Sequence, residues 1–309
     1  MAQMGRVGPV NLADDGKEGG RVNLNLILTN LLYGLTLGST LILISSGLSL
    51  TFGVMKVFSF AHGSLAMLGA YIGYSVVEMT GNFWLSFLIA PLAVGCLGLL
   101  MEYFTIRPLY GRDVLHIILL TVSLAMVFAN MVIIVWGPDQ CTVMLPDYFK
   151  GFVIIFGTPY PRFRLFVLFF SAAIALLIWF CITHTRWGIV VRAGMHSIET
   201  VSAFGINIQR VFTFVFAIGA ALAAMAGVIL GSMRVINSEM DLDILNSALI
   251  VVVIGGLGSF QGSVLGSLLI GVAEAFSAQF LPGVSKFTIW GIMVLVLLLK
   301  PEGLLKEGA

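Results

Sequence analysis

The sequence predicts an all-α, polytopic membrane protein with about eight transmembrane helices (roughly seven to nine), some of them short or broken by glycine-rich turns. Two observations support this prediction. Hydrophobic residues make up 59% of the 309 residues and charged residues only 10%, whereas a soluble domain carries roughly 25% charged residues. Long apolar segments also recur along the chain, and a helix needs about 20 apolar residues to cross a bilayer. Most of the surface is therefore expected to face the lipid bilayer or other apolar subunits.

The individual spans follow from these apolar segments. They lie near residues 26–54, 57–79, 84–106, 115–136, 163–183, 211–232 and 284–300. A further apolar stretch, 245–281, is interrupted by a cluster of glycines between Gly255 and Gly262. It is long enough for two short helices joined by a glycine turn. The total is therefore eight or nine crossings, and the sequence leaves both numbers open.

The two ends of the chain are polar. We expect a polar N-terminal tail over 1–24, a transmembrane domain over 25–305 and a C-terminal tail over 306–309. The three cysteines, Cys96, Cys141 and Cys181, are scattered, which predicts neither a disulfide framework nor a metal site. The net charge is +1 and no basic cluster is present, so we expect no nucleic-acid partner.

Arginines and lysines near the ends of the spans predict the orientation, because they concentrate on the cytoplasmic side of a membrane. They fall in three segments, which hold Arg107 and Arg112, then Arg186, Arg192 and Arg210, and finally Lys300 and Lys306. These segments are expected to share the cytoplasmic face, which places the C-terminus there. The loop 137–162 then faces outward, and the N-terminus lies outside if each early segment crosses once.

The loop 185–210 is a polar island between two long apolar blocks. Ser197 is a plausible N-cap, Glu199 lies in the first turn where the helix dipole favours an acid, and Gly205 suits a left-handed C-terminal position. A helix this short is marginal on its own. A partner surface that receives Val201 and Phe204 would explain it, and a connecting loop with an interfacial helix is the alternative.

Several segments along the chain form a recognisable series: Gly34-Leu35-Thr36-Leu37-Gly38, Phe60-Ala61-His62-Gly63, Arg107-Pro108-Leu109, Gly188 to Ile206, Phe214 to Val228, Gly255-Gly256-Leu257-Gly258-Ser259 and Pro301-Glu302-Gly303-Leu304. Together they resemble the permease subunits of branched-chain amino acid ABC importers, and the first, LivH-type permease most of all. The resemblance covers roughly residues 28–305 in order. The polar N-terminal tail departs from it.

The resemblance implies an importer in the bacterial inner membrane. A periplasmic binding protein would deliver the substrate to this chain and a sister permease, and two cytoplasmic ATPases would drive transport. The chain contains no G-x-x-x-x-G-K-[ST], the motif that cradles ATP phosphates. ATP and Mg would therefore be used by partner subunits, and this chain is expected to be no enzyme and to need no cofactor. Branched-chain or hydrophobic amino acids are the implied substrate; urea, short amides and aromatic acids are alternatives.

The same resemblance identifies the 185–210 loop as the segment that couples the permease to the ATPase. Its implied contact residues are Arg192, Ala193, Glu199, Ala203, Phe204, Gly205 and Ile206. Arg192 and Glu199 would lie at the rim of the contact, whereas Phe204 and Ile206 would provide apolar anchorage.

Polar side chains inside membrane spans are costly, so they are candidates for a transport pathway. We single out His62, Asn130 and Glu274. Each has a structural alternative, which for His62 is a satisfied histidine near a helix start and for Glu274 a structural hydrogen bond. A second function class is an ion-coupled secondary transporter or channel that uses His62, Glu102 or Glu274. It predicts transport without ATP and buried carboxylates that face one another.

Glycines at four-residue spacing let helices approach closely in lipid. Gly227 and Gly231, like Gly262 and Gly266, have this spacing, and Gly255, Gly256 and Gly258 occupy the predicted turn. We expect most of them to be packing contacts. Glycine-rich backbone at membrane depth is tolerated only where protein buries it or where it lines a wet cavity, which places the hairpin near the working part of the molecule.

Overall fold

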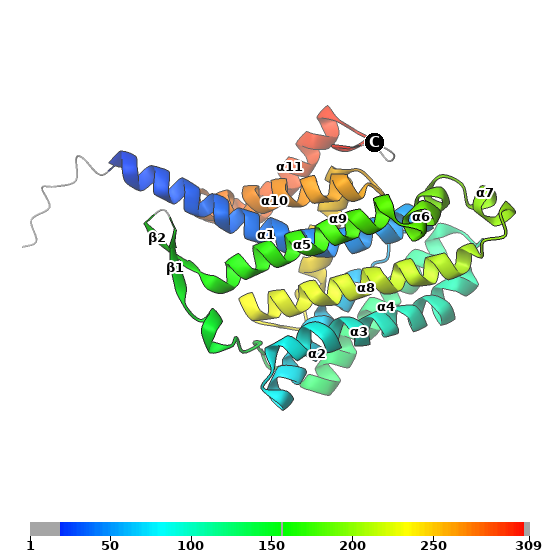
Figure 1. The fold of residues 1–309 in the computed structure, drawn as a ribbon, viewed down its shortest axis with the longest axis horizontal. Coiled ribbons are helices and arrows are strands. Elements are labelled where there is room, and N and C mark those ends of the chain that lie inside the picture. Colours follow the sequence, from blue (N-terminus) through cyan, green and yellow to red (C-terminus); the bar gives the residue numbers. More distant parts are fainter. Residues whose placement is uncertain (1–18, 156, 306–309) are drawn as a thin grey trace, which may run out of the picture.

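The computed structural model describes residues 19–155 and 157–305 (Figure 1). Most of the predicted N-terminal tail, residues 1–18, and the whole predicted C-terminal tail, 306–309, lie outside these ranges. The long helices are α1 (Gly19–Met55), α2 (His62–Thr80), α3 (Phe83–Met101), α4 (Val114–Trp136), α5 (Arg162–His184), α8 (Ile208–Met233), α9 (Met240–Gly255), α10 (Phe260–Phe280) and α11 (Ser285–Leu299). The prediction of an all-α membrane protein is confirmed.

Short elements connect these helices. The π-helical turn η1 (Glu102–Ile106) and the 3-10 turn η2 (Arg107–Leu109) extend α3, and η3 (Asp147–Phe149) and η4 (Pro282–Val284) lie in loops. The strands β1 (Phe152–Ile155) and β2 (Thr158–Pro161) form an antiparallel hairpin before α5. The helices α6 (Arg186–His196) and α7 (Ile198–Ala203) occupy the predicted polar island.

Six described helices are long and apolar enough to cross a membrane. They cover Leu24–Met55, Phe83–Leu109, Val114–Trp136, Arg162–His184, Ile208–Met233 and Phe260–Phe280, and a shorter apolar helix covers Phe287–Leu299. The span expected from residue 57 begins later, at His62, because the chain turns after Lys56, which has a φ of 54°. From His62 to Tyr71 every residue of α2 is buried, so other helices rather than lipid surround this part of α2.

The core is built on α1 and α8. Helix α1 packs chiefly against α10 and α8, and α8 packs against α2 and α3. Glycines make these approaches close, as small residues do in membrane proteins generally. A Cβ on Gly47 of α1 would lie 2.7 Å from the carbonyl oxygen of Gly219 in α8, and a Cβ on Gly227 would lie 1.9 Å from that of Ala66 in α2. A Cβ on Gly231 would lie 2.8 Å from the Cδ1 atom of Ile236.

The predicted glycine turn separates α9 from α10, so the prediction of two helices in 245–281 is confirmed. Gly256 and Gly258 have φ values of 107° and 81°, a backbone conformation that favours glycine. The Ser259 hydroxyl then accepts the Gly262 N–H at 3.1 Å and caps α10. The helices leave the turn in close contact, since a Cβ on Gly262 would lie 1.9 Å from the Gly255 carbonyl oxygen and one on Gly266 2.8 Å from that of Val251.

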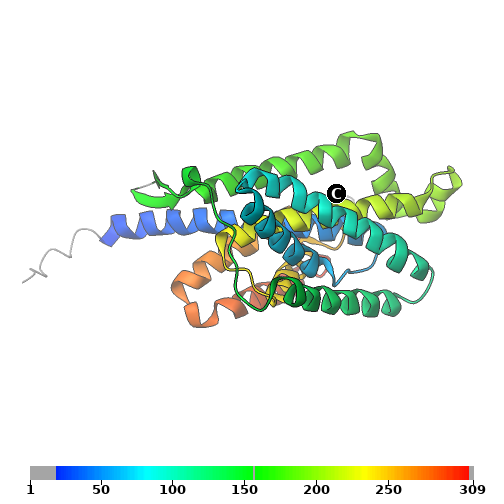
Figure 2. The ribbon, with the colours of Figure 1, turned by 90° about the horizontal axis from the view of Figure 1, so that it is seen from below.

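The basic segments gather at one end of the bundle. The turn after α3 and the α6–α7 segment lie at this end, and the β1–β2 hairpin and the start of α1 lie at the other (Figures 1 and 2). The Arg107 Nε donates to Gln209 Oε1 at 3.0 Å, which joins the turn after η2 to the start of α8. The segment after α11 reaches the same end, because the Leu304 N–H donates to the Ile254 carbonyl at 2.8 Å.

Candidate functional site

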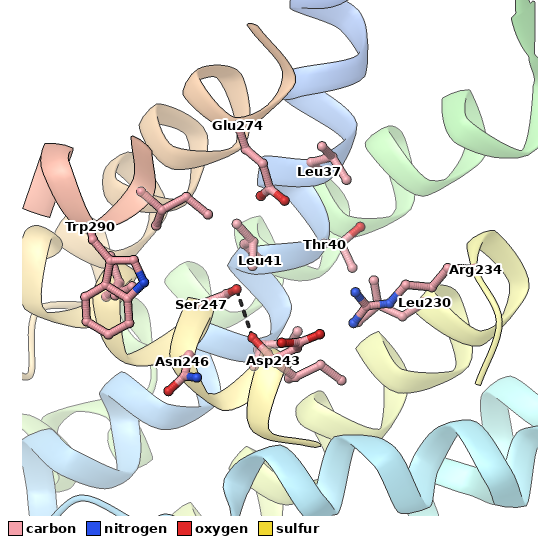
Figure 3. A pocket seen from close by; sticks show the side chains of 14 residues that line it. Leu37, Thr40, Leu41, Leu230, Arg234, Asp243, Asn246, Ser247, Glu274 and Trp290 are labelled. Atoms are coloured by element: carbon pink, nitrogen blue, oxygen red, sulfur yellow. Dashed lines mark hydrogen bonds between the residues drawn. The ribbon is translucent and has the colours of Figure 1, made fainter. Parts of the chain in front are cut away.

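A cavity of about 310 Å³ lies among α1, α8, α9, α10 and α11 (Figure 3). Its apolar lining comes from Leu37, Leu41, Ile44, Leu230, Ile244, Ile250, Ile289 and Trp290. Its polar lining comes from Thr40, Arg234, Asp243, Asn246, Ser247 and Glu274. Pockets of roughly 300–1,000 Å³ with an apolar wall and a few polar groups are typical of small-molecule sites. The cavity is therefore suited to one small ligand.

Three charged side chains face this cavity from three different elements. Figure 3 shows Glu274 entering from α10, Arg234 from the end of α8 and Asp243 from α9. Arg234 interacts electrostatically with both carboxylates. Among the described residues, however, no hydrogen bond or ion pair joins Arg234 to either of them. The three charged side chains therefore line the same cavity, and in the described chain no direct contact holds Arg234 against either carboxylate.

Local structure fixes the two charges that flank the α8–α9 connection. The Arg234 N–H donates to the Leu230 carbonyl at 2.9 Å, and two residues later Ile236 forms a β-bridge with Cys141. Asp243 lies in the first turn of α9, where the helix dipole stabilises an acid. Ser247, one turn further on, donates its hydroxyl to the Asp243 carbonyl at 3.0 Å.

The three predicted pathway residues occupy three different environments. Glu274 lines the cavity. His62 is 1% exposed, and its Nε2 lies 3.1 Å from the carbonyl oxygen of Ile44, a cavity residue. Asn130 is exposed on α4 and donates to the Met126 carbonyl at 2.7 Å. Of the three, only Glu274 is part of the cavity wall.

Arg234, Asp243 and Asn246 also line the cavity, and sequence reasoning did not select them. A usable signal was nevertheless present, since an arginine at the end of one span and an aspartate at the start of the next bracket a short connection.

Glu102 belongs to a separate polar cluster near the end that carries the basic segments. It is fully buried and accepts hydrogen bonds from the Tyr110 hydroxyl and the Thr213 hydroxyl. Burial and the bond to Glu102 raise the pKa of Tyr110, which keeps its hydroxyl a donor. Glu102, one of the three alternative groups that an ion-coupled transporter was expected to use, therefore belongs to a hydrogen-bonded cluster with Tyr110 and Thr213.

The α6–α7 segment extends beyond the bundle at this end (Figure 1). The Thr185 hydroxyl accepts the Gly188 N–H at 3.1 Å and caps α6. The helix expected after Ser197 is present as α7, and Gly205 follows it with a φ of 76°. Phe204 is 80% exposed, and Ala193, Ala203, Gly205 and Ile206 are also exposed.

Two other members of this segment face inward. Arg192 is half-buried and donates to the Ile182 carbonyl near the end of α5. Val201 is only 3% exposed, so the expectation that a partner receives Val201 is wrong; this chain already buries it. The side chain of Glu199 lies outside the described residues.

In the described part of the chain, no group of three or more histidines, cysteines and acids is positioned to hold a metal ion. The three cysteines are free thiols; Cys96 and Cys181 are exposed and Cys141 is half-buried.

Residues 30–298 match the family model described as branched-chain amino acid transport system / permease component. The chain is 32% identical over 296 residues to the high-affinity branched-chain amino acid transport system permease protein LivH of Salmonella typhimurium, which covers 90% of this chain and 95% of that protein. It is 31% identical over 297 residues to BraD of Pseudomonas aeruginosa, with the same coverage.

More distant similarities were also found. The chain is 24% identical over 294 residues to the permease protein LivM of Escherichia coli, covering 87% of this chain and 68% of LivM. Among solved structures, a chain of PsaBC from Streptococcus pneumoniae in complex with Fab aligns over 92% of both chains with a TM-score of 0.45 and 13% identity. On the family match and the LivH and BraD similarities, this multi-pass membrane protein belongs to the family of permease components of branched-chain amino acid transport systems.

Proposed function

We propose that the chain is a permease subunit of an ATP-binding-cassette importer. It carries branched-chain or other hydrophobic amino acids, delivered by a periplasmic binding protein, into the cytoplasm. Support comes from the family and from relatives that are named as high-affinity branched-chain amino acid permeases. A sister permease completes the pathway, in keeping with the weaker similarity to LivM.

The observation that carries the coupling to ATP is the exposed tip of the α6–α7 segment. Phe204 is 80% exposed beyond α7, and a large aromatic group in this position is a natural anchor for a partner pocket. The basic segments share this end of the bundle, which supports assigning it to the cytoplasmic face. Two cytoplasmic ATPases dock here and use ATP and Mg, and the C-terminus lies on the same side.

Contacts of α6 with α5 and α1 can transmit the movement of a docked ATPase to the helix bundle. Arg192 ties α6 to the last turn of α5. Met195 of α6 contacts the end of α1, since a Cβ on Gly53 would lie 2.6 Å from its terminal methyl group. A displacement of α7 therefore shifts α1 and α5, and α1 lines the cavity.

The test is co-purification of the chain with its partners, followed by uptake in liposomes. We expect a sister permease and two P-loop ATPases to be recovered, and Phe204→Glu to reduce ATPase recovery and ATP-dependent leucine uptake at least tenfold. Phe152→Glu is the matched control, because Phe152 is an exposed aromatic residue at the opposite end, and ATPase recovery is expected to stay normal. Uptake by this chain alone without ATP would favour an ion-coupled transporter instead.

A further inference from the structure

The three charges in the cavity among α1, α8, α9, α10 and α11 are arranged as if for a charged ligand. Structural ion pairs bring nitrogen and oxygen within about 4 Å, and Arg234 makes no such pair with Asp243 or Glu274 in the described chain. Glu274 is half-buried within the α10 span, where an acid is costly unless a partner compensates it. A ligand that carries both signs of charge supplies that partner.

We propose that this cavity binds an α-amino acid as a zwitterion during its passage. Arg234 takes the ligand carboxylate, Glu274 and Asp243 take its ammonium group, and the apolar wall takes its side chain. The proposal rests on the proposed function, which it deepens by giving the permease a substrate site of its own.

The chemistry of each group fits its role. The guanidinium fork matches a carboxylate in two parallel hydrogen bonds. The ammonium group has three donors, enough for both acids that face the cavity. The second acid does not leave the site strongly negative, because Asp243 lies in the first turn of α9 and the partial positive charge of that helix end offsets it.

The remaining wall selects the side chain of the ligand. Leu37, Leu41 and Ile44 come from α1, and Ile289 and Trp290 come from α11, so the surface opposite the charges is apolar. An aliphatic side chain gains by burial there, whereas a charged side chain finds no partner. Urea and short amides lack a carboxylate and leave Arg234 uncompensated, and a site built on such groups rejects ligands that lack them.

The test measures binding of radiolabelled leucine to the purified complex of this chain with its partner subunits, without the periplasmic binding protein. Arg234→Gln and Glu274→Gln are each expected to weaken leucine binding at least tenfold. Arg112→Gln and Asp139→Asn are matched controls, because both residues are exposed outside the cavity. Co-purification and an unchanged elution volume show that each variant has folded.

Ligand analogues separate a binding role from a structural one. For the wild-type complex, leucinamide, which lacks the carboxylate, and 4-methylpentanoate, which lacks the ammonium group, are expected to compete at least tenfold less well than leucine. Arg234→Gln is expected to abolish the discrimination against leucinamide only, and Glu274→Gln that against 4-methylpentanoate only.

Three results would overturn the proposal: no leucine binding by the wild-type complex, equal competition by all three compounds, or unchanged binding by both cavity variants. None of them touches the proposed function, which is decided separately by partner recovery and ATP-dependent uptake. Failure of that second experiment would remove the importer itself.

Discussion

At the scale of single residues, short side chains pair many of the buried polar groups, although the Asn30 amide nitrogen and the Ser49, Ser59 and Ser171 hydroxyls have no partner in the described chain. Hydroxyl groups return to helix carbonyls or to each other, as Ser45 and Ser267 do at 2.9 Å between α1 and α10. Ser64 donates to the buried Asp241 carboxylate at 3.0 Å. Such pairing explains how a chain with few charges still holds polar groups at its core, since unpaired buried groups are costly. The three cavity charges, which no hydrogen bond or ion pair joins in the described chain, differ from this background.

Closely packed glycines lead to a prediction about stability at the scale of single residues. Gly227→Ala is expected to destabilise the protein by about 1–3 kcal/mol, because the new Cβ would lie 1.9 Å from the Ala66 carbonyl oxygen. Thermal unfolding followed by size-exclusion chromatography measures the change. Gly291→Ala in α11 is the control, since its Cβ meets open space and alanine favours a helix. Equal unfolding temperatures for both variants would contradict the packing role.

At the scale of elements, the positions of the helices were easier to predict than which side of each helix is buried. Runs of apolar residues located the spans, and the glycines between Gly255 and Gly262 located the break between α9 and α10. The inward position of Val201 was not predictable, because α7 is too short to show a helical period and the neighbouring helices decide which face is covered. The β1–β2 hairpin was missed for a similar reason, since a few residues rich in proline carry little pattern.

The bond between α6 and α5 leads to a prediction at this scale. Arg192→Met keeps an aliphatic side chain but loses the donor to the Ile182 carbonyl. Hydrogen bonds from charged groups contribute about 1.5–3 kcal/mol, so ATP-dependent uptake is expected to fall roughly tenfold while ATPase recovery stays normal. The control is Arg210→Met, because Arg210 is exposed. Loss of ATPase recovery in Arg192→Met would mean that this residue acts in docking instead of transmission.

At the scale of the whole molecule, the candidate site depends on contacts that sequence spacing does not reveal. The cavity wall joins residues from α1 and α11, near opposite ends of the chain. Glu274 was found because an acid inside a span is unusual, whereas Arg234 and Asp243 lie at span ends where charges are common. Only the packing of α8, α9 and α10 turns those three charges toward one space. Composition therefore predicted the bundle, and the fold was needed for the site.

Orientation is the whole-molecule property that is easiest to measure. We expect a single cysteine at position 204 to react with a membrane-impermeant maleimide only from the cytoplasmic side, and one at position 152 only from the outside. Phe204 and Phe152 are exposed at opposite ends of the bundle. Labelling in intact and opened spheroplasts checks this, after Cys96, Cys141 and Cys181 are replaced by serine. The reverse pattern would invert the proposed topology.

The contact between the last described residues and the end of α9 also bears on biosynthesis. Leu304 and Leu305 donate to the carbonyls of Ile254 and Gly255, yet they leave the ribosome only after α10 and α11 have been made. Chains fold from the N-terminus as they are synthesised, so those two carbonyls wait for their partners while the membrane segments are already being inserted. The α9–α10 turn therefore closes only once residues 304 and 305 have been made, and a chain that stops before them would leave these two carbonyls without these donors.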